Sequence, residues 1–276
     1  MLLPDKTGQK MPEKMAQNRI HQLWDELHAI PPSDSGHALM RLQEVMAGLI
    51  GADQAYWVAA LCFPRHDDQP DNGLHGWRSR VGRSLHPYTR AQIALLQDVR
   101  RQSADGTLDP GDTTRALVEA AGTHRTRRLH DGLVNFDTFR QTQHYGSFYE
   151  AFGIVDRLWS VFPISQDAEA YFFFDLINTE RRFTQEDADT VATALRPLGW
   201  LQRQLFLSHG ILMADKPLTR MQNRIVHLLL TGKPEREIAM EAGQSVAAVH
   251  KHIGAIYRAF GVSSRTALMA LWLSGS

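Results

Sequence analysis

The side chains best suited to binding an anionic polymer lie near the end of this 276-residue chain. From Lys216 onward there are eight Lys and Arg residues and three Glu residues, although the whole chain has a formal net charge of zero. The tail is therefore basic and the rest is acidic. A basic module on an acidic protein is attracted to a phosphate backbone, so we expect a nucleic-acid surface in the tail.

Helix start and stop signals divide this tail into four short helices. Thr219 and Ser245 are expected to be N-cap residues, because a hydroxyl oxygen accepts a hydrogen bond from a free amide of the first turn. Three glycines are placed to end the first three helices: Gly232, Gly243 and Gly261. Pro234 is expected in the first turn of the second helix, and Ser263 or Ser264 is expected to cap the fourth.

The third helix of the tail is amphipathic. Its apolar residues recur at steps of three and four and predict one buried stripe: Val246, Val249, Ile253, Ile256 and Phe260. The opposite side carries His250, Lys251, Gly254 and Arg258. Two short helices joined by a Gly-containing turn, the second with a basic outer side, are typical of a helix-turn-helix. A plain helical hairpin packed on the rest of the chain is the alternative.

This segment resembles the LuxR-type domain of quorum-sensing regulators and NarL-like response regulators. The matching residues are Leu218-Thr219, Gly232, Glu237-Ile238-Ala239, Ser245, Val249, His252, Ile256-Tyr257-Arg258, Gly261-Val262 and Ser264-Arg265. The resemblance implies that Ser245 to Phe260 is the recognition helix, which enters the major groove of DNA. The DNA-binding residues that we expect are Pro234, Glu235, Arg236, Ser245, Val249, His250, Lys251, His252 and Arg258.

The same resemblance places a dimer contact on the last helix, at Leu268, Leu271 and Trp272. It also reveals departures, since the family usually has Thr-Val-Lys where Ala248-Val249-His250 stands. The lost Thr hydroxyl and the lost permanent charge are each expected to weaken phosphate contact by about 1 kcal/mol at most.

The remaining residues predict an α+β domain with an antiparallel sheet flanked by helices. The predicted helices are two within 12–50, separated by Pro31-Pro32-Ser33, several within 86–152, and one from Thr184 to Leu207. The predicted strands are 55–63, 74–81, 155–164 and 169–178, the last two forming a hairpin. The basic stretch 125–130 is expected to be a loop. We therefore expect a sensory domain at 1–207, a linker at 208–217 and an all-α four-helix DNA-binding domain at 218–276.

The first domain resembles the GAF- or PAS-like sensory domain of many LuxR-type regulators. The residues concerned are Ser147-Phe148-Tyr149, Phe152 to Leu158, Phe183-Thr184 and Ala194 to Leu198. The resemblance implies a small-molecule ligand without naming it. Aromatic residues expected to line a pocket are Trp57, Trp77, Tyr145, Phe148, Trp159 and Phe172. The alternative for each of them is that it fills the core.

Two other sensory domains fit less well. A phosphoryl receiver needs alternating β and α elements, which the first domain lacks. An acyl-homoserine-lactone receptor carries an Asp-Pro pair close after its Trp and Tyr residues, whereas Asp109-Pro110 lies far from Trp57.

Enzyme and membrane functions find little support in the sequence. No nucleophile-elbow, P-loop or dinucleotide-binding motif occurs, and the thirteen histidines have irregular spacing, so we expect no enzyme, no metal and no cofactor. Cys62, the single cysteine, allows no internal disulfide. Without a signal peptide or apolar span, a cytoplasmic protein without membrane contact is expected.

The sequence thus predicts a transcription regulator that senses a small molecule or a partner and binds double-stranded promoter DNA as a homodimer. The second hypothesis is an interaction protein, a co-regulator that docks on another regulator and binds DNA weakly.

Overall fold

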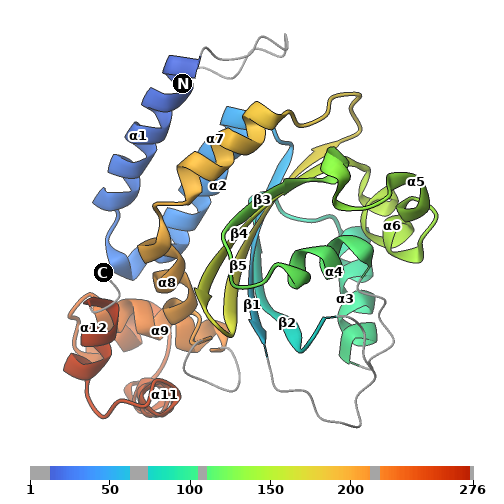
Figure 1. Ribbon diagram of the computed structural model, residues 1–276. Coiled ribbons are helices and arrows are strands. Elements are labelled where there is room, and N and C mark those ends of the chain that lie inside the picture. The colour runs from blue at the N-terminus through green and yellow to red at the C-terminus, as the bar shows by residue number, and fades with distance from the viewer. Residues whose placement is uncertain (1–12, 63–73, 105–110, 212–217, 274–276) are drawn as a thin grey trace. The chain divides into compact units, whose positions relative to one another are not determined.

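The computed structural model describes residues 13–62, 74–104, 111–211 and 218–273 (Figure 1). The chain forms two compact units. The first comprises residues 1–20 and 43–196, and the second comprises residues 21–42 and 197–276. The second unit therefore contains a helical segment from the N-terminal region in addition to the basic tail. Of the expected linker, residues 208–211 are described and 212–217 lie outside the described residues, as does Asp109-Pro110.

A five-stranded antiparallel sheet is the centre of the first unit. Its strand order is β2-β1-β5-β4-β3. The strands are β1 (Gln54–Cys62), β2 (Trp77–Ser84), β3 (Arg125–Arg128), β4 (Ile154–Ser165) and β5 (Ala168–Ile177). The predicted hairpin is confirmed, because β4 and β5 pair along most of their length from Ile154↔Ile177 to Ser165↔Ala168. The expected α+β fold with an antiparallel sheet is therefore confirmed.

The basic stretch 125–130 is not a loop as expected. Its first four residues form the edge strand β3, which pairs with β4 from Arg125↔Val161 to Arg128↔Leu158. The arginines are accommodated because their guanidinium groups find acceptors elsewhere. Arg128, for example, donates from Nη1 to the Phe183 carbonyl at 3.0 Å. Composition alone was misleading here, because ion pairs and hydrogen bonds offset the low strand preference of charged residues.

Helices cover both sides of the sheet (Figure 1). Helix α7 and the part of α2 that belongs to the first unit lie on one side; α3, α4, α5 and α6 lie on the other. The helices are α1 (Glu13–Ala29), α2 (Ser35–Ile50), α3 (Arg90–Ala104), α4 (Asp112–Glu119), α5 (Phe136–Phe139), α6 (Gln143–Phe148) and α7 (Gln185–Leu195). Pro31-Pro32-Ser33 separates α1 from α2 as predicted, through a short 3-10 turn at Pro32–Asp34.

The helix predicted from Thr184 to Leu207 is two helices. Helix α7 ends at Leu195 and α8 (Gly199–Ser208) follows in the second unit. Pro197 lies at the break, and a proline inside a helix removes a hydrogen bond and clashes with the preceding turn. The predicted cap is confirmed: Thr184 Oγ1 accepts from the Asp187 amide at 3.2 Å, and Asp187 Oδ2 accepts from the Thr184 amide at 2.8 Å.

A partly buried histidine gives the first unit a predictable response to acid. Burial lowers the pKa of His124 below its ordinary value of 6.5, and the nearby charges of Arg196 and Arg125 lower it further. The unfolded chain therefore takes up this proton more readily than the folded chain. The stability that depends on the neutral His124 ring is therefore fully present above about pH 6.5 and is lost as the pH falls below that value.

We accordingly expect His124→Gln to flatten the fall in melting temperature between about pH 7 and pH 5.5. The measurement is thermal unfolding followed by circular dichroism at several pH values. His86→Gln is the control, since His86 is an exposed histidine of the same unit. A His124→Gln protein with the wild-type pH slope would contradict the assignment.

Candidate nucleic-acid interface and sensory core

Four helices of the second unit carry the basic tail. They are α9 (Arg220–Leu230), α10 (Glu235–Ala242), α11 (Val246–Ala259) and α12 (Arg265–Leu273). Their caps follow the sequence signals. Thr219 Oγ1 accepts from the Gln222 amide, Ser245 Oγ from the Ala248 amide and Ser264 Oγ from the Ala267 amide, at 3.1–3.2 Å. Pro234 occupies the N-cap position of α10, one residue before the predicted first turn.

The turn between α10 and α11 depends on a glycine. Gly243 has a φ of 65°, in the left-handed region that residues with a Cβ atom rarely adopt. Its amide donates to the carbonyls of Ala239 and Met240, which closes the end of α10. Two residues later Ser245 starts α11. The chain therefore reverses within a few residues and sets α11 across α10, as in a helix-turn-helix.

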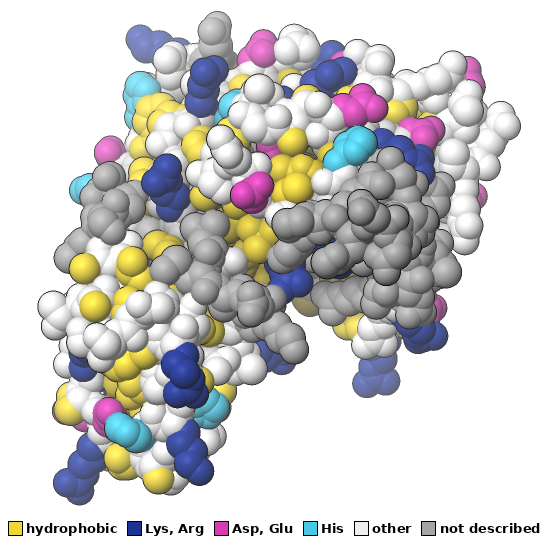
Figure 2. Space-filling model, turned by 60° about the horizontal axis from the view of Figure 1, so that its bottom comes forward, with side chains coloured by type: hydrophobic (Ala, Val, Ile, Leu, Met, Phe, Trp, Pro, Cys, Tyr) yellow, Lys and Arg dark blue, Asp and Glu magenta, His cyan; other side chains and the backbone are white. Residues whose placement is uncertain are grey.

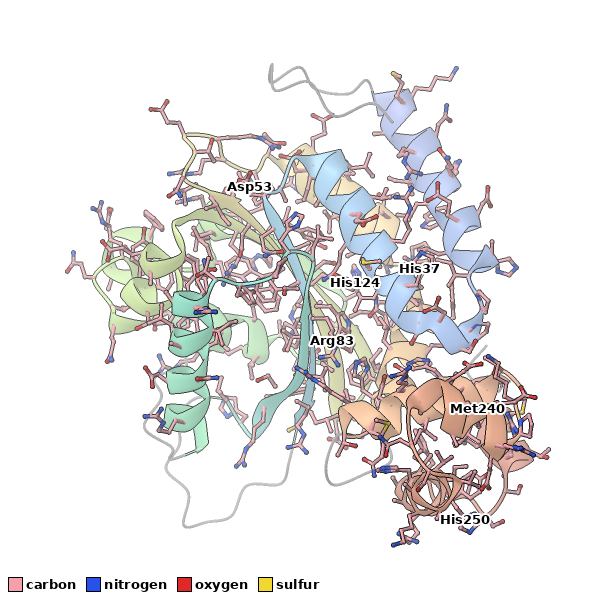
Figure 3. The ribbon with its side chains drawn as sticks, turned by 180° about the vertical axis from the view of Figure 1, so that it is seen from behind. His37, Asp53, Arg83, His124, Met240 and His250 are labelled. Carbon is pink, nitrogen blue, oxygen red and sulfur yellow. The ribbon has the colours of Figure 1, made fainter. Side chains whose placement is uncertain are left out.

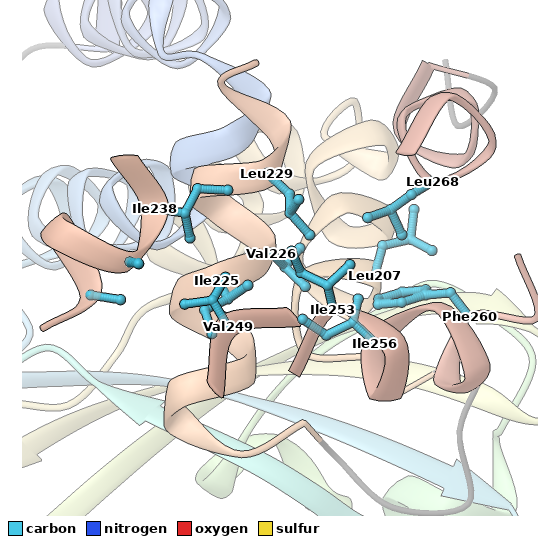
Figure 4. Close-up of a cluster of buried hydrophobic side chains, with 12 residues drawn as sticks. Leu207, Ile225, Val226, Leu229, Ile238, Val249, Ile253, Ile256, Phe260 and Leu268 are labelled. Atoms are coloured by element: carbon cyan, nitrogen blue, oxygen red, sulfur yellow. The ribbon is translucent and has the colours of Figure 1, made fainter. Parts of the chain in front are cut away.

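A hydrophobic core fixes which side of α11 remains exposed (Figure 4). Val249 and Ile256 are fully buried, and Ile253 and Phe260 are at most 4% exposed. The core is completed by Leu207, Ile225, Val226, Leu229, Ile238, Ala239, Ala242 and Leu268. The predicted stripe is confirmed except at its first residue: Val246 is 47% exposed, because it begins the helix beyond the reach of this core.

The burial of Val249 corrects one expected DNA contact. Its side chain packs inside the domain and presents nothing to a duplex. Lys251, which follows His250, is exposed. Arg258 and Ala247 lie on the same side of α11 and are exposed as well. His252 is partly buried. The outer side of α11 is therefore formed by two long cations with small residues around them.

The other expected contact residues lie at the start of α10 and of α11. Pro234, Arg236 and Ser245 are exposed, and Glu235 is partly exposed. Figure 3 shows His250 on α11. In the space-filling view, Lys, Arg and His side chains gather over the C-terminal helices at the lower left (Figure 2). All of the predicted DNA-binding residues except the buried Val249 and the partly buried His252 could therefore contact a polyanion together.

The expected dimer residues are placed differently from one another. Leu268 is fully buried in the core of its own domain, so its side chain is not available to a second copy. Leu271 packs partly against the same core. The side chain of Trp272 lies outside the described residues. Leu268 therefore belongs to the core of its own domain, and a dimer contact at Leu271 and Trp272 stays a prediction.

Arg265 has a structural role that the sequence did not reveal. Its Nε donates to the Leu229 carbonyl at 2.8 Å and its Nη1 to the Lys233 carbonyl at 2.7 Å. These carbonyls lie at the end of α9 and in the turn that follows, where helical partners are lacking. Arg265 therefore joins α12 to the turn before α10. Sequence analysis included it among the tail's charges and among the residues of the resemblance, but did not predict these hydrogen bonds.

The predicted pocket residues of the first unit lie on opposite sides of the sheet. Residues paired across antiparallel strands point to the same side. Trp57 pairs with Phe172, while Trp159 pairs with Phe173, the neighbour of Phe172. Trp57 and Phe172 therefore face one side and Trp159 the other. The second side also carries Trp77, Tyr145 and Phe148, which pack in one cluster with Trp159. The six residues cannot line one pocket.

We call the side that carries Trp159 the aromatic face. A buried ion pair lies on it that sequence reasoning missed. Arg157 Nε donates to Asp175 Oδ1 at 2.6 Å, and its Nη2 donates to Asp175 Oδ2 at 2.8 Å. The guanidinium carbon lies 4.7 Å from the ring centre of Tyr149 and 5.3 Å from that of Tyr56. Burial alone lowers the pKa of Arg157, but the Asp175 carboxylate outweighs it, so this pKa is raised and the arginine stays charged.

A second buried ion pair lies near the edge of the aromatic face. Arg125 donates to both oxygens of Glu169, at 2.8 and 2.9 Å, and Tyr171 Oη donates to Glu169 Oε2 at 2.6 Å. Burial and the neighbouring carboxylate raise the pKa of Tyr171. Each buried charge on this face thus has an opposite charge beside it. The face combines aromatic rings with compensated polar groups, which is typical of a ligand-binding interior.

Within the described part of the chain, no helix is long and apolar enough to cross a membrane. Among the same residues, no group of three or more His, Cys, Asp or Glu side chains is arranged to hold a metal ion.

Comparison with known proteins assigns the tail to a family. Residues 216–272 match the GerE family model, described as bacterial regulatory proteins of the luxR family. This domain is a LuxR-family helix-turn-helix, and it implies DNA binding. Proteins of this family are transcription regulators rather than enzymes. A search of curated proteins finds no match.

Solved structures that match this chain include SdiA in complex with octanoyl-rac-glycerol, which is 14% identical, with 97% of each chain covered and a TM-score of 0.37. Escherichia coli SdiA in another crystal form is 14% identical over 94% of this chain and 97% of that chain, with a TM-score of 0.39. The VqsR LBD domain from Pseudomonas aeruginosa is 13% identical over 68% of this chain and 94% of that chain, with a TM-score of 0.42. Likenesses this weak say nothing about a ligand of this chain.

Proposed function

We propose that this chain, whose residues 216–272 are a LuxR-family helix-turn-helix domain, is a transcription regulator that binds promoter DNA through α11 and responds to a ligand. The observation that carries the proposal is the asymmetry of α11. Its apolar stripe is sealed in the core while Lys251 and Arg258 are exposed on the opposite side. A helix with this asymmetry suits the major groove, whose edges and phosphates are polar or charged.

In this proposal the starts of α10 and α11 position the helix on the duplex. Arg236 and the exposed Pro234 contact the phosphate backbone, and Ser245 adds a hydroxyl at the start of α11. Lys251 and Arg258 lie two helical turns apart and follow the groove. The domain binds as a homodimer to a site with two-fold symmetry, each α11 in one major groove. The protein acts in the cytoplasm.

The sensing part of the proposal rests on the aromatic face. Aromatic side chains and two compensated ion pairs are gathered between the sheet and α4, α5 and α6. A small, largely uncharged molecule with some polar groups matches this surface better than an ion, because Asp175 and Arg125 already neutralise Arg157 and Glu169. Binding would stabilise the folded first unit.

A second candidate function is that of a co-regulator that docks on another regulator and binds DNA weakly. The specific observation behind it is His250 in place of the usual lysine, next to a carboxylate. An acyl-homoserine-lactone receptor is the weakest of the ligand-sensing proposals.

A mobility-shift assay with the DNA upstream of this protein's own gene, at two salt concentrations, tests the proposal. We expect a specific complex that weakens steeply as salt rises, because phosphate contacts release bound cations. Absence of any complex at low salt would favour the co-regulator. Native mass spectrometry of the purified protein tests sensing: a bound small molecule supports it, and a protein with nothing bound argues against it.

A further inference from the structure

A contact between a histidine ring and a carboxylate joins the two helices of the helix-turn-helix at its exposed edge. His250 Nδ1 on α11 lies 3.2 Å from Glu235 Oε2 and 3.3 Å from Glu235 Oε1, at the start of α10. The His250 side chain is 76% exposed and that of Glu235 is 39% exposed. Neither side chain is required by the core. The pair is therefore a feature of the surface rather than of the fold.

The position of His250 on α11 places this pair beside the cations proposed to meet DNA. Successive residues of a helix are turned by about 100°. His250 follows the buried Val249 and precedes the exposed Lys251, so it lies between the core and the outer side of the helix. That is the flank of α11 nearest α10. The Glu235 carboxylate consequently stands at the edge of the proposed DNA surface, where phosphates would pass.

The side chain beside the Glu235 carboxylate is the imidazole of His250 rather than the permanent positive charge of a lysine. Two nearby basic groups are engaged elsewhere: Lys233 pairs with Glu241, and Arg265 donates to backbone carbonyls. A carboxylate beside the duplex repels phosphates and penalises contacts that depend on charge alone.

We propose that Glu235 and His250 set the DNA selectivity of the domain. Glu235 weakens attachment to any duplex, and its contact with the His250 ring limits this weakening. Sequence-dependent contacts made by the outer side of α11 then contribute a larger share of the binding free energy at the true site. This inference rests on the proposed function, because it assigns a role within the same DNA surface.

The test measures binding of a fluorescent non-cognate duplex by anisotropy at several salt concentrations. We expect Glu235→Gln to tighten this binding about three- to tenfold near 0.1 M salt, the size expected for one phosphate interaction. His250→Lys should act in the same direction and steepen the salt dependence by about one phosphate contact. Binding to the site upstream of the protein's own gene should change less. The ratio of specific to non-specific affinity should therefore fall in both variants.

Glu237→Gln is the matched control, because it removes the same charge from an exposed position two residues along α10. Circular dichroism melts verify that each variant is folded. If the wild-type protein binds the duplexes but Glu235→Gln binds no more tightly than Glu237→Gln, the selectivity proposal is wrong and the proposed function stands. If the wild-type protein binds no duplex at low salt, the proposed function fails and the selectivity proposal fails with it.

Discussion

Asp175→Ala is expected to lower the free energy of unfolding of the first unit by about 3–5 kcal/mol. The substitution leaves the Arg157 guanidinium, whose side chain is 8% exposed, buried without its carboxylate. The rings of Tyr149 and Tyr56 remain beside the cation but replace only part of that interaction. The loss approaches the total stability of an average domain, so a large fraction of the variant should be unfolded at moderate temperature.

Urea unfolding followed by tryptophan fluorescence measures this effect, since Trp57 and Trp159 are buried on the two sides of the sheet. The control is the double variant Arg157→Met with Asp175→Leu. Removing both charges together should cost less than removing one, because no unpaired charge stays buried. An Asp175→Ala protein within about 1 kcal/mol of the wild type would show that the ion pair does not hold this face together.

Phe260→Ala is expected to destabilise the helix-turn-helix by about 3–5 kcal/mol. Phe260 is 1% exposed and caps the end of α11, with its ring inside the core that also buries Ile253 and Ile256. Truncation leaves a cavity that these aliphatic neighbours fill only partly. Because the exposed cations of α11 depend on this packing for their orientation, duplex binding should be lost together with the fold.

Val246→Ala serves as the matched comparison, since it also shortens an apolar side chain of α11 but at a position that is 47% exposed. It should change stability by no more than about 0.5 kcal/mol. Hydrogen exchange of α11 amides and anisotropy with a duplex report folding and binding separately. Equal effects of the two substitutions would mean that the buried stripe does not organise the domain.

Local signals predicted most of the elements in this chain. The caps at Thr184, Thr219 and Ser245 depend on a hydroxyl and an amide three residues apart, so the sequence alone determines them. The β4–β5 hairpin is long and strongly apolar. The break at Pro197 also had a local signal, which the apolar periodicity on either side obscured.

The remaining features depend on partners that are distant in sequence. Strand β3 exists because β4 offers it an edge and because Glu169, 44 residues away, accepts from Arg125. The ion pair of Arg157 and Asp175 spans two strands, and neither residue is exceptional in its local sequence. Such long-range pairing cannot be read from periodicity, which reports only neighbours along the chain.

Site prediction failed where one residue could serve two purposes. Val249 and Leu268 fit both a buried stripe and a family contact, and the structure places both in the core. The pocket prediction gathered aromatic residues by type, although strand alternation sends Trp57 and Trp159 to opposite sides. By contrast, the exposure of Lys251 and Arg258 follows directly from the helical period of α11.

Genome-wide mapping of bound sites, for the wild type and for Lys251→Glu, tests the central claim most directly. Lys251 is exposed, so its replacement should leave the fold intact while placing a negative charge against the phosphates. Lys14→Glu, an exposed change on α1, is the control. We predict discrete occupied sites for the wild type and for Lys14→Glu, and their loss in Lys251→Glu. Unchanged occupancy in Lys251→Glu would contradict a DNA surface on the outer side of α11.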